Sequence, residues 1–215
     1  RKPSTIRGAY SASLLGTIRS HLEGLQGYDV MALELIQNAD DAKADTLSFD
    51  ITAAGLLITN SGQFTYCGDL TAQPCGFQRS DRYSCDFHRV TEVASGGKLS
   101  HGENIGRFGI GFVSTYQVTD HPEISSSGIR LTLRPESSDW EIEECEQASG
   151  TVVFLPWAGD PHSEARRALG MSCVGPAHIE QLALDFEGVL RRSLLFLRHI
   201  RRAEVRRDGH LVLAC

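Results

Sequence analysis

Three polar side chains recur at helical spacing within the segment ELIQNADDAKA. Glu34, Asn38 and Asp41 stand at positions i, i+4 and i+7, so they share one side of an α-helix. The residues directly beside them form an apolar stripe: Met31, Leu35, Ala39 and Ala42. A short amide and two carboxylates next to small alanines favour the edge of a cleft over a solvated face, where long Lys and Arg side chains are expected. Taken alone, the segment fits an ordinary amphipathic helix equally well.

A glycine-rich segment, GRFGIGFVSTYQVTD, follows about seventy residues later. Gly106, Gly109 and Gly111 let the backbone approach a ligand closely and direct free N–H groups at a phosphate. A helix that begins at Gly111 and Phe112 would add the positive end of its dipole to the same anion site. Such loops also form tight turns, so this segment is weak evidence by itself. Its pairing with the polar side of the helix favours a phosphate site.

A third group combines thiols with an imidazole: Cys67, Cys75, Cys85 and His88. Four such ligands within about twenty residues could form a tetrahedral Cys₃His zinc site, and the C-x-x-H step from Cys85 to His88 is a spacing that such sites use. The surrounding segment is poor in apolar residues, so it needs another source of order, which a metal would supply. Free buried cysteines are the alternative, and a disulfide is disfavoured in a cytoplasm.

Periodic apolar residues predict the elements that must position these groups. Helices are expected over residues 11–25, 29–44 and 176–202. Strands are expected over residues 46–52, 56–59, 129–134, 139–145 and 151–157, with a hairpin over 203–215. Residues 61–106 show no strong period and are typical of a long functional or mobile excursion with short helices. The order predicts an α+β two-layer sandwich: a mixed, mostly antiparallel sheet with helices on one face.

Composition narrows the class of protein. The 215 residues are 41% hydrophobic and 22% charged, as in a globular protein, and we expect one domain. The net charge of -6 disfavours a nucleic-acid binder with a broad basic surface. Seven arginines between Arg191 and Arg207 favour a solvated face or a contact with a neighbouring domain over a nucleic-acid contact.

No segment is apolar enough to predict a membrane span or a secretory signal, so we expect a cytoplasmic protein that does not enter a membrane. The sequence begins at Arg1 without a methionine and closes an apolar run at Cys215. We therefore expect a fragment of a longer multidomain polypeptide.

The two phosphate-site segments resemble the GHKL, or Bergerat-fold, family of ATP-binding domains. Glu34, Asn38, Asp41 and Ala42 match its E-x-x-x-N-x-x-D-A signature. GRFGIGF is similar to the glycine box at the end of the family's lid in its chaperone form, as are three residues after it: Ser114, Tyr116 and Asp120. Thr151 resembles the threonine near the adenine pocket. Within the family, the likeness is closest to the sacsin-type repeat and the 90-kDa heat-shock chaperones, over about Leu14 to Leu155.

The resemblance implies that residues 1–215 form one ATP-binding domain whose lid spans about residues 61–106. Asn38 would hold Mg²⁺ through its side-chain oxygen, and Glu34 would act as the general base. Asp41 and Ala42 would line the nucleotide pocket. The glycine box would bind the phosphates, through Gly106, Arg107, Phe108, Gly109, Ile110, Gly111 and Phe112. Lys98 could reach the terminal phosphate when the lid closes, and a plain exposed lysine is the equal alternative.

This chain departs from the family's D-x-G-x-G box at two of its three fixed positions: Asn60 replaces the aspartate and Phe64 the second glycine, whereas Gly62 keeps the first. The Asn60 oxygen can still accept a hydrogen bond from the adenine amino group, but its own NH₂ then needs an acceptor. We therefore expect weaker selectivity for adenine. Phe64 in place of the second glycine would stiffen or reshape the start of the lid.

The resemblance implies an ATPase whose cycle closes the lid and changes the conformation of attached domains. It also implies chaperone-like or protein-remodelling work on a client protein, and it would allow an ATP-dependent dimer. The alternative is a nucleotide-sensing module without significant turnover. Glu34 argues against that alternative, and the altered box at Asn60 argues mildly for it. Hydrolysis by the isolated domain could be slow, because relatives often need a basic residue from a following domain. A histidine kinase would need an upstream phosphoacceptor helix, which this sequence does not contain.

Overall fold

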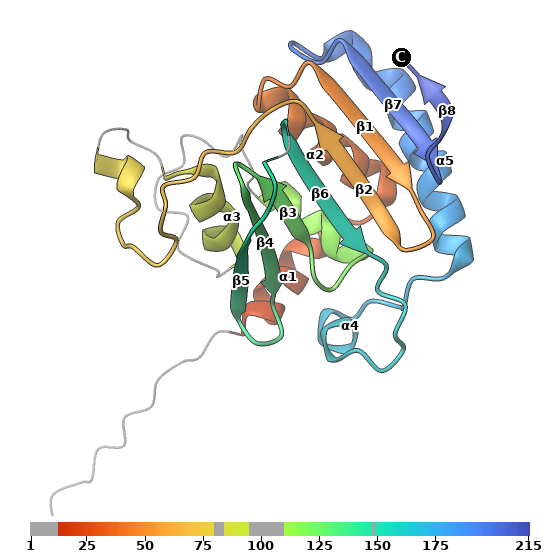
Figure 1. Ribbon diagram of the computed structural model, residues 1–215. Helices are drawn as coiled ribbons and strands as arrows, with labels where there is room; N and C mark the ends of the chain where they lie inside the picture. Colours follow the sequence, from red (N-terminus) through yellow and green to blue (C-terminus); the bar gives the residue numbers. More distant parts are fainter. Residues whose placement is uncertain (1–12, 80–83, 95–109, 148) are drawn as a thin grey trace, which may run out of the picture.

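An eight-stranded sheet organises the fold, with the strand order β5-β4-β3-β6-β2-β1-β7-β8. This computed structural model describes residues 13–79, 84–94, 110–147 and 149–215 (Figure 1). The strands are β1 (Thr46–Ile51), β2 (Gly55–Asn60), β3 (Glu123–Ser126), β4 (Ile129–Arg134), β5 (Asp139–Glu144), β6 (Thr151–Pro156), β7 (Arg202–Arg207) and β8 (His210–Ala214). Neighbouring strands pair antiparallel except β1 and β7, which are parallel.

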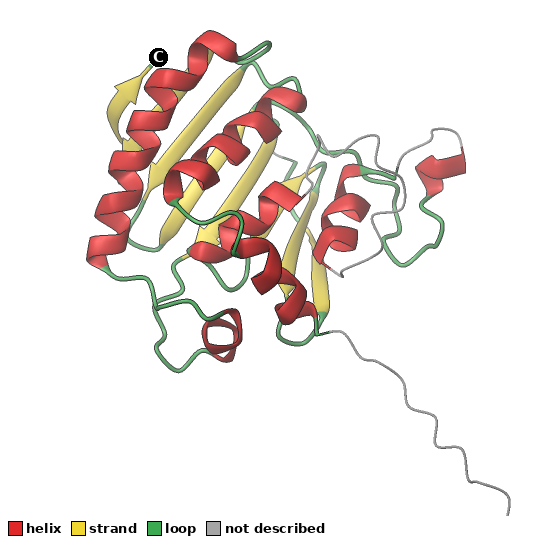
Figure 2. Cartoon of the chain, turned by 180° about the vertical axis from the view of Figure 1, so that it is seen from behind, coloured by secondary structure: helices red, strands yellow, loops and turns green. Residues whose placement is uncertain are grey.

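The long helices cover one face of this sheet, as the two opposite views show (Figures 1 and 2). The α-helices are α1 (Leu14–Leu22), α2 (Tyr28–Asp41), α3 (Asp86–Ala94), α4 (Glu164–Leu169) and α5 (Pro176–Ser193). The 3₁₀ helices are η1 (Gly76–Arg79), η2 (Ile110–Gln117) and η3 (Leu194–Phe196). Helix α2 packs against both α5 and η2. The prediction of an α+β two-layer arrangement with a mixed, mostly antiparallel sheet is therefore confirmed.

Alternating burial along β1 explains why the helices lie on that face. Leu47, Phe49 and Ile51 are buried, whereas the residues between them are half-buried. The Phe49 ring meets the Phe186 ring of α5 edge-on, with 4.9 Å between the centroids. Burying each such side chain contributes roughly 1.5–3 kcal/mol, so the period-two pattern determines which face of the sheet receives α5.

The structure departs from the predicted elements where tertiary contacts override local pattern. Helix α5 ends at Ser193 rather than near residue 202, and the chain turns toward β7. In that turn the backbone N–H groups of Arg198, His199 and Ile200 donate to the carboxylate of Asp40 at 2.7–3.1 Å. These bonds replace the helical ones, because a carboxylate is a strong acceptor for free N–H groups.

Two short elements were not predicted. Strand β3 has only one apolar residue, Ile124, and it exists because its backbone completes the pairing between β4 and β6. Helix α4 has six residues and is capped at its start by Ser163, whose side chain accepts from the N–H of Arg166. The segment expected to open an α-helix at Gly111 instead forms the 3₁₀ helix η2. Of the helices in the described residues, none is both long and apolar enough to cross a bilayer.

Arginines near the C-terminus lie beside carboxylates rather than forming an open basic face. The pairs are Arg201–Asp45 at 3.4 Å, Arg202–Glu204 at 2.5 Å, Arg206–Glu204 at 2.7 Å and Arg207–Glu180 at 2.8 Å. Glu204 is buried between two of them, and the guanidinium of Arg206 outweighs burial and holds the pKa of Glu204 below its ordinary value. Much of the local positive charge is therefore neutralised within the fold.

Candidate functional site

Helix α2 and the 3₁₀ helix η2 bring Glu34 against the backbone of Gly111. A Cβ atom added to Gly111 would lie 1.8 Å from Oε2 of Glu34 and 2.6 Å from its Cδ, so any larger residue would displace the carboxylate. Glu34 is half-buried, and this burial raises the pKa of its carboxyl group above the ordinary 4.5. A carboxylate with a raised pKa is a stronger base, which suits proton abstraction near neutral pH.

Asn38 lies one turn further along α2 and is 7% exposed. Its amide nitrogen, Nδ2, has no hydrogen-bond partner among the residues that the structure describes. Buried polar groups in folded proteins are nearly always paired, so this amide N–H is a donor that a ligand or a water could satisfy. We call Glu34, Asn38 and Gly111 the α2–η2 site.

The end of β2 meets α2 and the start of β6 beside this site. The N–H of Gly62 donates to Oδ1 of Asn60 at 2.9 Å, and the hydroxyl of Thr151 donates to the carbonyl of Gly62 at 2.7 Å. A Cβ on Gly62 would lie 2.9 Å from the carbonyl oxygen of Ala42, so α2 and this loop touch through their backbones. Four of the predicted nucleotide residues therefore gather in one place, at the end of the sheet where α2 ends.

Ser126 belongs to the same group, although its sequence context gave no signal for it. It is 1% exposed, it donates to the carbonyl of Gly150 at 3.0 Å, and it accepts from the N–H of Phe64 at 3.1 Å. Its oxygen also lies 3.0 Å from that of Thr151. Ser126 thus fixes the loop that follows Gly62, and only the pairing of β3 with β6 brings it there.

Some predicted residues lie apart from this group. Asp41 is exposed and lines a cavity of about 210 Å³ between α2 and the end of α5, together with Asp40 and Phe196. Phe112 is buried in the main core. Ile110 begins η2, and the remaining predicted phosphate and lid residues lie outside the described ranges: Lys98, Gly106, Arg107, Phe108 and Gly109.

The three predicted residues after the glycine box are packed or paired within the fold. Ser114 and Tyr116 are buried in η2, where Tyr116 packs against the smaller core cluster that includes Ile18 and Leu22. Burial raises the pKa of the Tyr116 hydroxyl. Asp120 accepts a hydrogen bond from the guanidinium of Arg166.

Arg166 holds the far end of η2 in place, a role that the sequence analysis did not predict. Its side chain is 2% exposed and pairs with Asp120. The same guanidinium donates to the carbonyl of Gln117 at 3.2 Å, to that of Thr119 at 2.8 Å and to that of Tyr116. A buried arginine needs such partners, because an unpaired charge away from water is costly. Arg166 therefore sets the orientation of the helix whose first turn carries Gly111.

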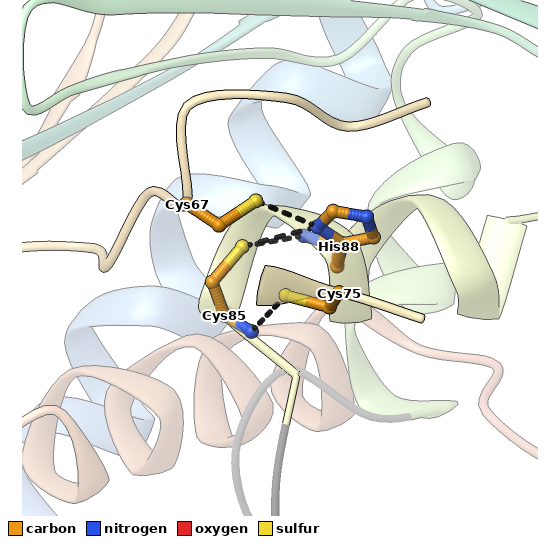
Figure 3. A group of neighbouring side chains, drawn as sticks. All are labelled: Cys67, Cys75, Cys85 and His88. Carbon is orange, nitrogen blue, oxygen red and sulfur yellow. Dashed lines mark hydrogen bonds between the residues drawn. The ribbon is translucent and has the colours of Figure 1, made fainter. Parts of the chain in front are cut away.

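The second candidate site is the Cys/His cluster: Cys67, Cys75, Cys85 and His88 (Figure 3). The four ligand atoms all lie within 4.8 Å of one another. Three of the residues are almost completely buried, and Cys67 is half-buried. Burial, together with the neighbouring Cys67 thiol, raises the pKa of Cys85 to about 12. The predicted convergence of these residues is confirmed, and the group could bind a metal such as zinc.

This chain is similar to a known protein family and to two long relatives. Residues 11–139 match the Sacsin domain family. Protein NO VEIN of Arabidopsis thaliana is 37% identical over 105 residues, which cover 46% of this chain and 3% of that protein. Sacsin of Homo sapiens is 29% identical over 140 residues, which cover 63% of this chain and 3% of that protein. The chain thus spans about 3% of the length of these curated relatives. Since the matched region includes more than half of the 215 residues and both segments of the α2–η2 site, the chain belongs to the Sacsin domain family.

Proposed function

We propose that this domain binds Mg·ATP at the α2–η2 site and hydrolyses it. The observation that carries the proposal is the contact of the Glu34 carboxylate with the backbone of Gly111, next to the unpaired buried amide of Asn38. A general base, a polar ligand group and a glycine-containing turn in one place suit hydrolysis of the phosphoanhydride bond of ATP. Membership of the sacsin family supports the same assignment through the motifs that the chain carries.

The residues present fit a magnesium-bound nucleotide. Mg²⁺ takes oxygen ligands and is usually shared between one or two protein side chains and the substrate phosphates. The Asn38 carboxamide can supply one such oxygen, while its amide nitrogen, which has no partner among the described residues, can donate to a phosphate oxygen. The metal would neutralise charge on the phosphates when bound.

Glu34 would remove a proton from the attacking water. Its carboxylate is half-buried and its pKa is raised by that burial, so it accepts a proton more readily than an exposed glutamate. Gly111 leaves room for the carboxylate at that position. Glu34 and Gly111 together direct the catalytic carboxylate toward the first turn of η2.

The base-binding side of the pocket would be formed by Asn60, Gly62 and Thr151. The Asn60 oxygen already accepts from the N–H of Gly62, which leaves one lone pair for an exocyclic amino group of the base. Thr151 holds the loop by donating to the carbonyl of Gly62. Its role is then to position the loop that borders the base.

Turnover would change the conformation of other parts of the polypeptide. The curated relatives are far longer than this chain, so further domains and a protein client are the natural recipients of such a change. Closure of the lid over about residues 61–106, and chaperone-like or remodelling work, are part of this proposal.

Calorimetric titration with ATP, ADP and GTP, with and without Mg²⁺, tests nucleotide binding directly. We expect wild type to bind ATP and ADP more tightly with Mg²⁺, and we expect Asn38→Ala to lose the magnesium dependence. Gln37→Ala is the matched control, since Gln37 is exposed on the same helix. The proposal fails if the intact protein binds no adenine nucleotide, or if the two variants behave alike.

A second function, nucleotide sensing without turnover, is favoured by one observation. Asn60 replaces the family's aspartate, and its oxygen is partly used within the loop. Single-turnover hydrolysis distinguishes the two functions. For an ATPase, Glu34→Gln should slow the chemical step by about 10²–10⁴-fold, the usual contribution of a general base. A sensor would show equal, near-zero rates for both proteins and unchanged ATP binding.

A further inference from the structure

We propose that Cys67, Cys75, Cys85 and His88 bind one structural zinc ion, which joins the chain after β2 to the start of α3. The four residues come from three separate stretches: the segment after β2, the turn before η1, and the first turn of α3 with the residue before it. The four residues lie within the proposed lid, about residues 61–106, but none belongs to the α2–η2 site, so the inference does not require that a nucleotide binds there.

The spacing of the ligand atoms matches a tetrahedral site. Sulfur at about 2.3 Å and nitrogen at about 2.0 Å from a tetrahedral zinc are separated from one another by roughly 3.5–3.8 Å. Nδ1 of His88 lies 3.3 Å from Sγ of Cys67 and 3.3 Å from Sγ of Cys85, and every pair of ligand atoms is within 4.8 Å. Side-chain adjustments of about an ångström or less would therefore bring all four atoms to zinc-binding positions. Figure 3 shows the side chains directed at a common centre.

The orientation of His88 is that of a metal ligand. Its Nε2 lies 3.1 Å from the carbonyl oxygen of Ala72, and a carbonyl can only accept, so Nε2 carries the proton. In a neutral imidazole this leaves the lone pair on Nδ1, the nitrogen that faces the thiols. A second hydrogen bond that fixes the tautomer in this way accompanies nearly every zinc-bound histidine.

Backbone N–H groups already point at two of the sulfurs. The N–H of Cys85 donates to Sγ of Cys75 at 3.3 Å, and the N–H of His88 donates to Sγ of Cys85 at 3.4 Å. Such donors stabilise thiolates, which are the form that binds zinc. The Cys67 thiol donates to the carbonyl of Asp69 at 3.2 Å, a bond that metal binding would replace.

The site is closed, which indicates a structural rather than a catalytic ion. Cys75, Cys85 and His88 are 1%, 2% and 1% exposed, and all four tetrahedral positions are filled by the protein. A disulfide would use two of the thiols and leave a third thiol and an imidazole directed at the same centre. A single metal ion accounts for all four groups.

The ion would strengthen a link that the chain already makes between the segment after β2 and the start of α3. Thr65 donates to the Asp86 carboxylate from its N–H at 2.8 Å and from its hydroxyl at 2.7 Å, and the N–H of Asp86 donates back at 2.9 Å. Phe87 adds edge-on contacts with Phe64 and Tyr66. Zinc would add coordinate bonds on both sides of this contact.

Metal analysis and cobalt substitution test the inference. The full chain, purified without added metal or chelator, should contain one zinc per molecule. After removal of zinc, one equivalent of Co²⁺ should give the visible absorption of tetrahedral cobalt and a thiolate-to-cobalt charge-transfer band. Cys85→Ser should reduce bound zinc below one tenth of an equivalent, whereas Cys173→Ser, which changes a cysteine outside the cluster, should retain it.

The cobalt experiment on wild type keeps the test decisive if Cys85→Ser does not fold. Octahedral cobalt spectra, an equal zinc content in the two variants, or wild-type protein that takes up neither metal would overturn the proposal. A disulfide among these cysteines in protein purified under reducing conditions would overturn it as well.

Discussion

Helix α2 and the segment between β2 and α3 both carry predicted site residues, but different contacts hold the two regions in place. Helix α2 buries Met31, Ala32 and Ile36 completely and packs against α5 and η2, so Glu34 and Asn38 are positioned by a continuous core. The segment after β2 lies beside the sheet (Figure 1), where Phe64 and Phe87 reach the same core and polar links such as that between Thr65 and Asp86 are added. The first region is thus held mainly by apolar packing, and the second by packing together with specific polar links.

The largest loss of stability is expected on replacing Arg166, and it would sharpen this comparison. Replacing it with leucine leaves Asp120 and three carbonyls at the end of η2 without their donor. Removing one partner of a buried ion pair costs about 3–5 kcal/mol, and we expect urea denaturation to show that loss in the free energy of unfolding. Arg167→Leu is the control, because that side chain is 69% exposed and its nearest carboxylate is 4.0 Å away. A similar loss in both variants would show that the packing of α4, rather than the buried charge, is responsible.

Metal removal should have an intermediate and local effect. With a chelator, we expect amide hydrogens of Phe87 and His88 to exchange at least about tenfold faster, which corresponds to about 1.4 kcal/mol of lost local stability. Amides of Ile36 and Leu35 in α2 should keep their protection, because no ligand of the cluster lies on α2, although Cys75 and Cys85 border the same core. Equal acceleration in both regions would break the comparison, and so would no change in either.

Asp40 should give the smallest effect, with a defined pH dependence. Burial alone would raise the pKa of this carboxyl group, but the N–H groups of His199, Arg198 and Ile200 outweigh it and hold the pKa below 3.8. Its stabilising contribution is therefore complete above the unfolded pKa of 3.8 and is lost as the pH falls through the lower folded pKa.

Asp40→Asn should lower the free energy of unfolding by about 1 kcal/mol at neutral pH, the net value of a typical hydrogen bond. That difference from wild type should shrink as the pH falls below 3.8. Asp41→Asn, at the exposed neighbouring position, should change stability little at any pH. A difference that persists unchanged at low pH would show that the charge of Asp40 does not contribute.

The sequence predicted the parts of the fold and of the candidate sites that follow from local periodicity or residue type. The period of 3.6 located α2, and alternation located β1, because burial on one face dictates both patterns. The Cys/His cluster was predicted from residue type, and the structure confirms that its members converge. The nucleotide roles of Glu34 and Asn38 stay predictions.

The remaining contacts could not be predicted, because they join segments with no local signal. Arg166 looks like an ordinary surface arginine in EARRAL, and only the position of η2 makes it a buried donor. Ser126 lies in the run SSS, where nothing distinguishes it from its neighbours. Its partners Phe64 and Gly150 are brought together by the sheet. Such roles depend on tertiary geometry rather than on propensity.

The central place of β6 has a practical consequence for where the folding unit ends. This strand is inserted between β3 and β2, yet it begins at Thr151, beyond the last residue of the family match at 139. A polypeptide truncated at that boundary would leave two inner strands with bare edges and Gly62 without the hydroxyl that holds its carbonyl. Unpaired inner edges invite aggregation, so expression boundaries should extend at least through β8, which pairs with β7 beside β1.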